Sequence, residues 1–375
     1  MPSVLFSGTL LIGIIIIRSM QAVLMEECAV GQKYPFVFQT LMLFPFFMQT
    51  ILFFTLTVLE YGLRRGINTL VSAAQHMRPV VFFSTLLTVN VVAQGWALVY
   101  IDSSTYVVVL QLLVIFVAIA ERVLLKREMS AMLWSLVFVQ SGAIMSYQWT
   151  VTNSHELAHR SSGELEGRQL TAPVHSAGSQ LIGVSLVVGG MLCCAIGGIF
   201  QQRFLQDTAE LKLSLNVKLF YQFLFGFLGV VLYTVSSRDA MDSIIQEGFF
   251  HGWNRTTLEV GMLMWAAYLV STLICAYLSA LAGAMAIALV VIAVGAFNAL
   301  VRGWTTSPLQ VLLMVLVSGN SASFAYLRAC AGHPRDAAAK DVVDSSMLTL
   351  HGLQKGFGTF SADSKPASKF NVEEA

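Results

Sequence analysis

The segment from His155 to His159 reads His-Glu-x-x-His, a spacing that could hold a zinc ion. On a helix, two histidines four residues apart face one metal, and the glutamate between them can activate a bound water. Here the segment lies in a polar connection over residues 150–179, where His175 and Glu164 are the candidates for a third ligand. A solvated loop with a chance match is the preferred interpretation. We therefore expect no catalytic residue, no metal and no cofactor, and keep a membrane zinc metalloprotease using His155, Glu156 and His159 as the third hypothesis.

Three polar side chains interrupt apolar stretches. Burying a charge in hydrocarbon costs several kcal/mol, which makes Arg18 a candidate for binding an anionic substrate. The alternative is that Arg18 extends its guanidinium to the membrane interface. Asn90 and Gln94 are four residues apart and so share one face of a helix. They either line a cavity or form hydrogen bonds between helices.

The elements that must position these residues are membrane-spanning helices. Hydrophobic residues make up 56% of the 375 residues and charged residues 11%, whereas a soluble domain carries about 25% charged residues. About 20 apolar residues cross a bilayer as a helix. Ten such stretches are predicted, roughly Val4–Leu24, Phe36–Leu59, Pro79–Tyr100, Thr105–Val123, Ser130–Gln148, Leu181–Phe204, Val217–Tyr233, Val260–Leu278, Ala280–Val301 and Leu309–Leu327.

The predicted fold is therefore an all-α polytopic membrane protein with one bundle over residues 1–328. A count of eight or nine helices is the rival, because Leu278 runs almost directly into Ala280. Residues 329–375 form a polar tail that we expect to be disordered.

The basic residues indicate the orientation. With ten crossings, most of the 22 Lys and Arg residues fall on the side of the two termini, which predicts that both termini face the cytosol. Asn254 begins the sequon Asn-Arg-Thr on the opposite, lumenal side and is a candidate for glycosylation. A net charge of +1 says nothing about nucleic acid. The sequence has no basic cluster with interleaved aromatic residues, so we expect no nucleic-acid partner. The lipid bilayer is the expected surroundings.

Four segments resemble the pyrimidine nucleotide-sugar transporters, the family of the CMP-sialic acid and UDP-galactose carriers. The first runs from Asp102 through Trp149 and begins Asp-Ser-Ser-Thr-Tyr. The second is Gly197–Arg203, the third runs from Ser214 to Gly226, and the fourth runs from Gly248 to Gly303 and begins Gly-Phe-Phe-His-Gly-Trp.

The resemblance implies a drug/metabolite-transporter fold of ten helices in two inverted five-helix repeats. The repeats would cover residues 1–148 and 181–328, with the lumenal loop 150–179 between them. Such carriers exchange a nucleotide sugar for a nucleoside monophosphate by alternating access, usually in the Golgi membrane. A UDP-sugar such as UDP-galactose or UDP-N-acetylglucosamine is the expected substrate, and the endoplasmic reticulum is the alternative location. A homodimer, or a heterodimer with a related carrier, is a further expectation.

Four more candidate binding residues follow from the resemblance. Tyr106 and Tyr277 match family tyrosines and could contact a nucleobase, although buried tyrosines also serve ordinary packing. Gln111 matches the family and can donate and accept hydrogen bonds within a span. Lys218 matches a basic family position at the cytosolic mouth, as does Arg203, where contact with lipid headgroups is the competing role.

The chain departs from the family where lysines are expected. Leu113 and Ala276 stand at two lysine positions, and Gly283 stands at a third. Further family polar positions carry Val91, Val92, Phe44, Phe47, Ser279 and Ala280. A buried anion needs a paired charge. The second hypothesis is therefore a repurposed paralogue that carries another, less anionic metabolite or acts as a non-transporting partner.

Overall fold

A computed structural model describes residues 4–28, 36–101, 103–161, 177–206, 213–301 and 307–331. Every regular element within these ranges is an α-helix. The chain divides into a first unit, Met1–Phe324, and a second unit, Ala325–Ala375. The second unit is described only as far as Ala331, so most of the predicted tail, 329–375, lies outside the described residues.

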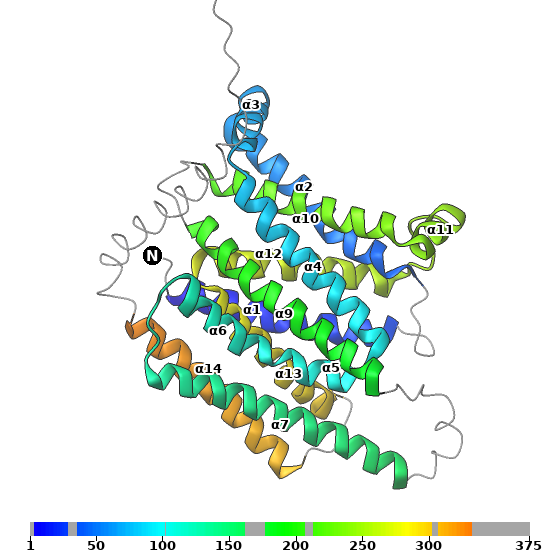
Figure 1. Cartoon of the computed structure of the whole chain (residues 1–375), viewed down its shortest axis with the longest axis vertical. Coiled ribbons are helices and arrows are strands. Elements are labelled where there is room, and N and C mark those ends of the chain that lie inside the picture. The colour runs from blue at the N-terminus through cyan, green and yellow to red at the C-terminus, as the bar shows by residue number, and fades with distance from the viewer. Residues whose placement is uncertain are drawn as a thin grey trace, which may run out of the picture. The chain divides into compact units, whose positions relative to one another are not determined.

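Figure 1 labels the helices, which are coloured in chain order. In the first half of the chain they are α1 (Val4–Cys28), α2 (Phe38–Tyr61), α3 (Leu63–Ala74), α4 (Arg78–Tyr100), α5 (Ser103–Leu110), α6 (Leu112–Leu124) and α7 (Ala131–Ser161). The second half contains α9 (Ala177–Gln206), α10 (Leu215–Ser236), α11 (Arg238–Glu247), α12 (Arg255–Tyr277), α13 (Ala280–Val301) and α14 (Pro308–Ala331).

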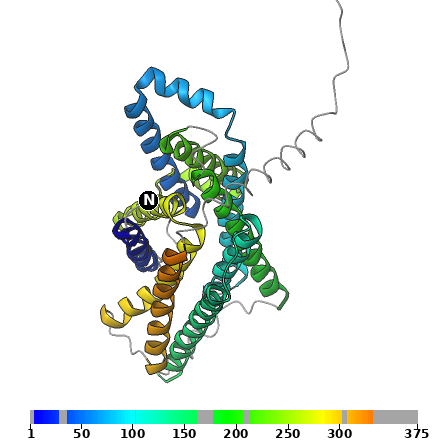
Figure 2. The same cartoon turned by 90° about the vertical axis from the view of Figure 1, so that its left-hand side faces the viewer.

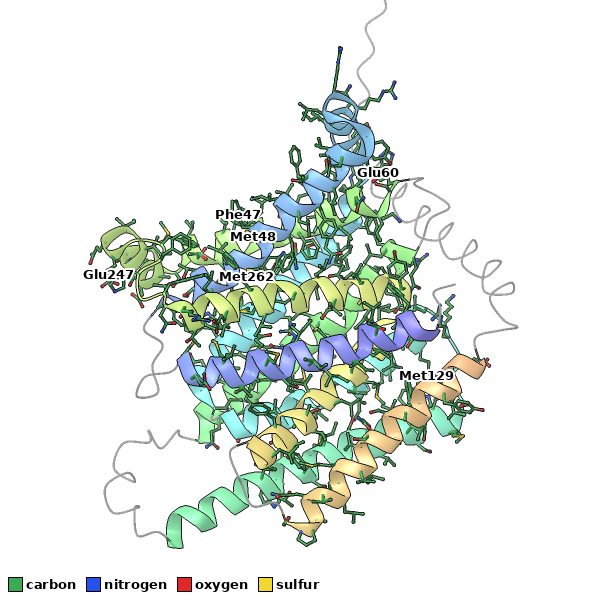
Figure 3. All side chains as sticks on the ribbon, turned by 180° about the vertical axis from the view of Figure 1, so that it is seen from behind. Phe47, Met48, Glu60, Met129, Glu247 and Met262 are labelled. Atoms are coloured by element: carbon green, nitrogen blue, oxygen red, sulfur yellow. The ribbon has the colours of Figure 1, made fainter. Side chains whose placement is uncertain are left out.

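Seven described helices are long and apolar enough to cross a membrane, namely α1, α2, α4, α9, α10, α12 and α13. Many large apolar side chains are exposed on them, as expected for a surface that faces lipid rather than water. Figure 3 shows Phe47, Met48 and Met262 on this surface, all exposed. The predicted all-helical, multi-pass membrane protein is therefore confirmed.

Close helix contacts organise the first unit. α4 packs along α9, α2 packs along α10, and α1 contacts both α12 and α13. Small residues allow the first of these contacts: a Cβ at Gly190 would lie 3.3 Å from Ala93, and one at Gly197 would lie 3.3 Å from Leu86. Glycine lets two helix backbones approach closely in a membrane.

The helices differ most from the prediction at the end of α7 and within the fourth predicted span. α7 continues to Ser161, whereas the sequence analysis ended this helix at Gln148 and placed a loop over 150–179. The extension has no glycine or proline before Gly163, so nothing local stops the helix. The fourth predicted span divides into α5 and α6 at Gln111, whose φ of −66° and ψ of −19° remain close to helical. This is an interruption of the hydrogen-bond pattern rather than a turn.

The junction between α12 and α13 is a sharp break. Leu278 has φ −118° and ψ −102°, far from helical values, and Ser279 follows before α13 begins at Ala280. The two helices are therefore separate elements, as predicted. Two helices, α3 and α11, were not predicted, because both lie in connections that the search for long apolar stretches passes over.

Candidate functional site

Three of the predicted binding residues form a continuous hydrogen-bonded chain. The Tyr106 hydroxyl of α5 donates to Gln94 Oε1 of α4 over 2.9 Å. Gln94 Nε2 in turn donates to Asn90 Oδ1, one turn away on α4, over 2.8 Å. The i, i+4 spacing of the two amides thus aligns them on one face. A ligand at this chain would meet a hydroxyl and two amides that can both donate and accept.

Arg18 lies inside the bundle against α12. Its Nη1 donates to Gln21 Oε1 over 2.9 Å, and its guanidinium carbon lies 5.2 Å from the centre of the Tyr268 ring. The Tyr268 ring stacks on Phe46 of α2, with 5.2 Å between ring centres. A cation over an aromatic face is favourable, by about 0.5–2 kcal/mol. These contacts hold a fixed positive charge where α1, α2 and α12 meet.

None of the described hydrogen bonds or ring contacts joins Arg18 to the hydrogen-bonded chain, but the two have neighbours in common. Arg18 and Tyr106 each lie within electrostatic reach of both Cys194 and Tyr268. We call this group the central polar cluster, and its members are Arg18, Gln21, Asn90, Gln94, Tyr106, Cys194 and Tyr268. A guanidinium can bind phosphate oxygens in a bidentate manner. The cluster therefore combines an anion-binding group with amide and aromatic groups suited to a heterocyclic base.

Two buried side-chain atoms, one turn from Phe46 and Tyr268, lack hydrogen-bond partners among the described residues. Gln49 Nε2 donates to the Trp265 carbonyl over 2.6 Å, but Gln49 Oε1 and Trp265 Nε1 have no partner among the described protein atoms. Gln49 follows Phe46 by one turn, and Trp265 precedes Tyr268 by one turn. A buried unpaired polar group costs about 1–3 kcal/mol. An acceptor and a donor are thus available to a ligand or water beside the cluster.

Gln49, Trp265 and Tyr268 are not among the binding residues predicted from the sequence. The sequence contains a signal for two of them. Trp265, Tyr268 and Thr272 are spaced by three and four residues, so they place two aromatic rings and polar atoms on one face of an apolar helix. Gln49 is an amide within an apolar span, as are Asn90 and Gln94, and the same criterion applies to it.

The structure places two predicted residues away from the cluster. Lys218 is 1% exposed, and its Nζ donates to the Phe204 carbonyl over 2.9 Å, which ties the first turn of α10 to the end of α9. It therefore lies in a protein contact and not at a headgroup. Tyr277 is 42% exposed at the end of α12, where its ring meets the edge of Phe6.

Gln111 and Asn254 have distinct positions. Gln111 is 5% exposed at the junction of α5 and α6, little more than one turn from Tyr106. The Asn254 Oδ1 caps α12 by accepting from the Thr257 N–H over 2.8 Å and from its hydroxyl over 2.9 Å. The Nδ2 atom, which would carry a glycan, is not needed for this cap.

The predicted zinc pattern lies on the last turns of α7, but the side chains of residues 152–161 are outside the described part of the chain. The candidates for a third ligand, His175 and Glu164, also lie outside the described residues. Within the described ranges, no three His, Cys, Asp or Glu side chains gather as a metal site.

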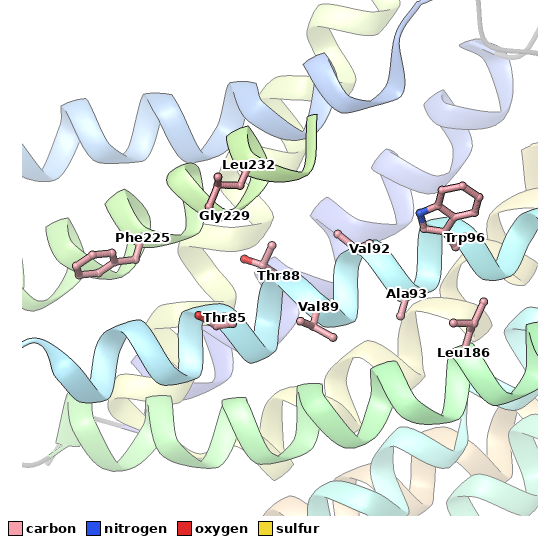
Figure 4. Close-up of a pocket in the computed structure, with 10 residues that line it drawn as sticks. All are labelled: Thr85, Thr88, Val89, Val92, Ala93, Trp96, Leu186, Phe225, Gly229 and Leu232. Atoms are coloured by element: carbon pink, nitrogen blue, oxygen red, sulfur yellow. The ribbon is translucent and has the colours of Figure 1, made fainter. Parts of the chain in front are cut away.

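An apolar groove of about 400 Å³ lies between α4, α9 and α10 and is distinct from the cluster. Thr88, Trp96 and Leu232 are among its lining residues (Figure 4). Trp96 and Leu232 are exposed, so the groove opens on the outer surface of the bundle. It lacks a charged lining residue and does not suit an anionic substrate.

Comparison with known proteins decides the family. The model of a family described as nucleotide-sugar transporter matches residues 47–321, which is most of the chain. The chain belongs to the nucleotide-sugar transporter family. The resemblance seen in the sequence is therefore confirmed. Because this is a family of carriers and not of enzymes, the metalloprotease hypothesis is set aside.

Individual relatives of this family member are more distant. It is 28% identical over 169 residues to the UDP-N-acetylglucosamine transporters of Canis lupus familiaris and Homo sapiens, which is 44% of this chain. It is 27% identical over 163 residues to the UDP-N-acetylglucosamine transporter of Mus musculus. The match spans less than half the length of these relatives, 44–45%.

At several positions where this family member departs from the family pattern, an apolar side chain packs against apolar neighbours. Leu113 is half-buried against the core, and Ala276 packs against a second apolar cluster. Phe44 meets the edge of Trp253, and Phe47 lies on the outer surface. Among the residues of the central polar cluster, Arg18 is the one cation, and it precedes the region that the family model matches.

Proposed function

We propose that this protein is a Golgi nucleotide-sugar antiporter that exchanges a UDP-sugar for a nucleoside monophosphate by alternating access. The observation that carries the proposal is the central polar cluster, in which Arg18 and the Asn90–Gln94–Tyr106 chain of a family member share Cys194 and Tyr268 as neighbours. Substrate sites of such carriers lie near the bilayer midplane between the two halves. The relatives named as UDP-N-acetylglucosamine transporters favour that sugar nucleotide.

Each part of the cluster has a role in this proposal. The Arg18 guanidinium pairs with phosphate oxygens, and Gln21 orients it through their 2.9 Å hydrogen bond. The amides of Gln94 and Asn90 and the Tyr106 hydroxyl bind the edge of the pyrimidine. Gln111 extends this polar surface at the α5–α6 junction. Lys218 and Tyr277 support the helices that form the site rather than contacting substrate.

The proposed topology has ten crossings in two inverted five-helix repeats, with α5 and α6 together forming the fourth crossing. Both termini face the cytosol, because most basic residues lie on that side. Asn254 then faces the lumen, where it can be glycosylated. The endoplasmic reticulum is the alternative compartment, and pairing with a second carrier is compatible with the fold.

A repurposed paralogue is the second candidate function. The observation that favours it is the apolar filling of the family lysine positions, which leaves the single charge of Arg18 opposite the two charges of a pyrophosphate. Such a protein would carry a less anionic metabolite or support another carrier.

The test is thermal stability of the purified full-length protein against UMP, CMP, GMP, AMP and inorganic phosphate. A ligand that binds only the folded state stabilises it by about 2.7 kcal/mol at a hundredfold excess over Kd. The proposal predicts a rise in melting temperature with UMP that exceeds the rise with purine nucleotides or phosphate. Folded protein that no nucleotide stabilises would contradict it and favour the paralogue.

A further inference from the structure

The short helix α3 carries three different surfaces. Successive residues are rotated by about 100° around a helix. Leu70 and Ala73 are buried against the bundle. The next sector holds apolar side chains that are exposed, Leu63, Ile67 and Val71. The remaining sector holds the exposed polar residues Arg64, Arg65, Asn68 and Ser72.

This order of sectors fits a helix at the rim of a membrane protein. A helix at that rim contacts protein on one side, hydrocarbon on a second and water on a third. The buried sector, the exposed apolar sector and the polar sector of α3 correspond to these three surroundings. A helix wholly in water has no reason to expose Leu63 at 63% and Val71 at 67% on one stripe. Exposed apolar stripes of this kind mark an interaction surface.

The orientation of α3 agrees with this position. Figure 1 views α3 nearly end-on while α2 and α4 run across the view, and Figure 2 shows it crossing the end of α2. α3 is therefore steeply inclined to the spans that it joins, as a helix lying in the plane of the membrane surface would be.

Specific contacts hold α3 in this orientation. Gly62 adopts a φ of +78° between α2 and α3, a conformation open mainly to glycine. A Cβ at Gly66 would lie 3.3 Å from the Val58 Cα, so α3 folds closely over the end of α2. The Tyr221 hydroxyl donates to the Leu70 carbonyl. The exposed stripe is thus presented by a fixed element.

Charge distinguishes α3 from α11, the other helix that was not predicted. α3 contains two arginines and no acidic residue. α11, which the proposed topology places at the lumenal face, contains Arg238 but also Asp239, Asp242 and Glu247. Glu60, just before α3, accepts a hydrogen bond from Asn216. The arginines of α3 therefore present positive charge that complements anionic headgroups.

We propose that α3 is an interfacial helix that binds the cytosolic leaflet. Leu63, Ile67 and Val71 insert below the headgroups, while Arg64 and Arg65 pair with anionic phospholipid. The side of the membrane rests on the orientation given under the proposed function, but the insertion itself does not. In the cytosolic leaflet, anionic lipids attract basic residues close to the surface.

Photocrosslinking of the full-length protein tests this directly. A photoreactive diazirine side chain replaces Ile67, and the protein is reconstituted into vesicles of phosphatidylcholine, alone or mixed with phosphatidylserine. The matched control places the same side chain at Asn68, in the polar sector of α3. A second variant at Val71 repeats the test one turn further along.

Lipid adducts at positions 67 and 71, but not at 68, are the expected result. In mixed vesicles, the fraction of adducts formed with phosphatidylserine should exceed the fraction of phosphatidylserine in the lipid, by about fivefold for each arginine. In the Arg64→Gln, Arg65→Gln double variant, the fraction of phosphatidylserine adducts should equal the fraction of phosphatidylserine in the lipid. Covalent dimers, a crosslinked protein partner, or reaction with water alone at positions 67 and 71 would overturn the proposal. Transport is not measured, so failure here would leave the proposed antiporter activity unaffected.

Discussion

At the scale of single residues, Arg18 carries the electrostatic part of the proposed site. It contributes a permanent charge, because a guanidinium stays protonated, and its surroundings offer Gln21 and Tyr268 but no carboxylate within the described contacts. An arginine without an acidic partner inside a bundle remains available to an anion. Neutral hydrogen-bonding groups on α4 and α5 complete the site.

Replacing Arg18 by alanine should weaken UMP binding by about tenfold to a hundredfold, since a hydrogen bond to a charged group contributes about 1.5–3 kcal/mol. Arg18→Lys keeps the charge but loses the bidentate geometry, so its affinity for UMP should lie between those of the parent and of Arg18→Ala. Isothermal titration with UMP measures both. Arg255→Ala, which removes an exposed arginine paired with Glu259, is the matched control and should bind as the parent does.

Tyr106→Phe should lower the free energy of unfolding by about 1 kcal/mol, because it removes one hydrogen bond, to Gln94, while keeping the ring. It should also weaken UMP binding more than binding of inorganic phosphate. Melting temperature and titration provide the two readouts. Equal loss for both ligands would place the hydroxyl at the phosphate rather than at the base.

At the scale of elements, the contact between α4 and α10 depends on a missing side chain. A Cβ at Gly229 would lie 2.6 Å from Thr88 Oγ1 and 3.2 Å from its Cβ. Figure 4 shows the two residues facing each other across the two helices. The branched threonine cannot move aside without moving α4, which also carries Asn90 and Gln94.

Gly229→Ala should therefore destabilise the protein by about 1–3 kcal/mol through overpacking. Gly189→Ala is the control, because a Cβ there meets nothing within 4 Å. That substitution should leave stability unchanged or raise it by about 0.5–1 kcal/mol, since alanine favours helix over glycine. The melting temperatures of the two variants test this prediction. An equal change in melting temperature for both variants would contradict the close contact between Gly229 and Thr88.

The elements also indicate how far sequence reasoning reaches. Each of the ten apolar stretches corresponds to helix, because hydrocarbon requires every backbone group to be paired internally. The shared face of Asn90 and Gln94 follows from their spacing alone. In contrast, the contact of Arg18 with Tyr268 joins residues far apart in the chain, and their meeting depends on how α1 packs against α12. Helix α3 was missed because its pattern is too short and too polar for a search for spans.

At the scale of the whole molecule, orientation is the property that links the helices to transport. An antiporter of the proposed kind must receive nucleotide sugar from the cytosol and nucleoside monophosphate from the lumen. The excess of basic residues on one side predicts cytosolic termini, and this orientation would place the capping residue Asn254 in the lumen.

Epitope tags at both termini should be accessible to antibody after selective permeabilisation of the plasma membrane, with the Golgi membrane intact. Asn254→Gln should remove any glycan-dependent shift in gel mobility. It should also destabilise α12 by about 0.5–2 kcal/mol through loss of its cap. A tag reached only after the Golgi membrane is opened would contradict the orientation.

Exchange itself is the most direct test of the proposed activity. Full-length protein is reconstituted into vesicles preloaded with UMP or left empty, and uptake of labelled UDP-N-acetylglucosamine is followed. If the protein is an antiporter, internal UMP should accelerate uptake. The Arg18→Ala variant should show no uptake, and the Arg255→Ala variant should take up substrate as the parent does. Absence of uptake by folded protein, or uptake indifferent to internal UMP and to Arg18, would contradict it.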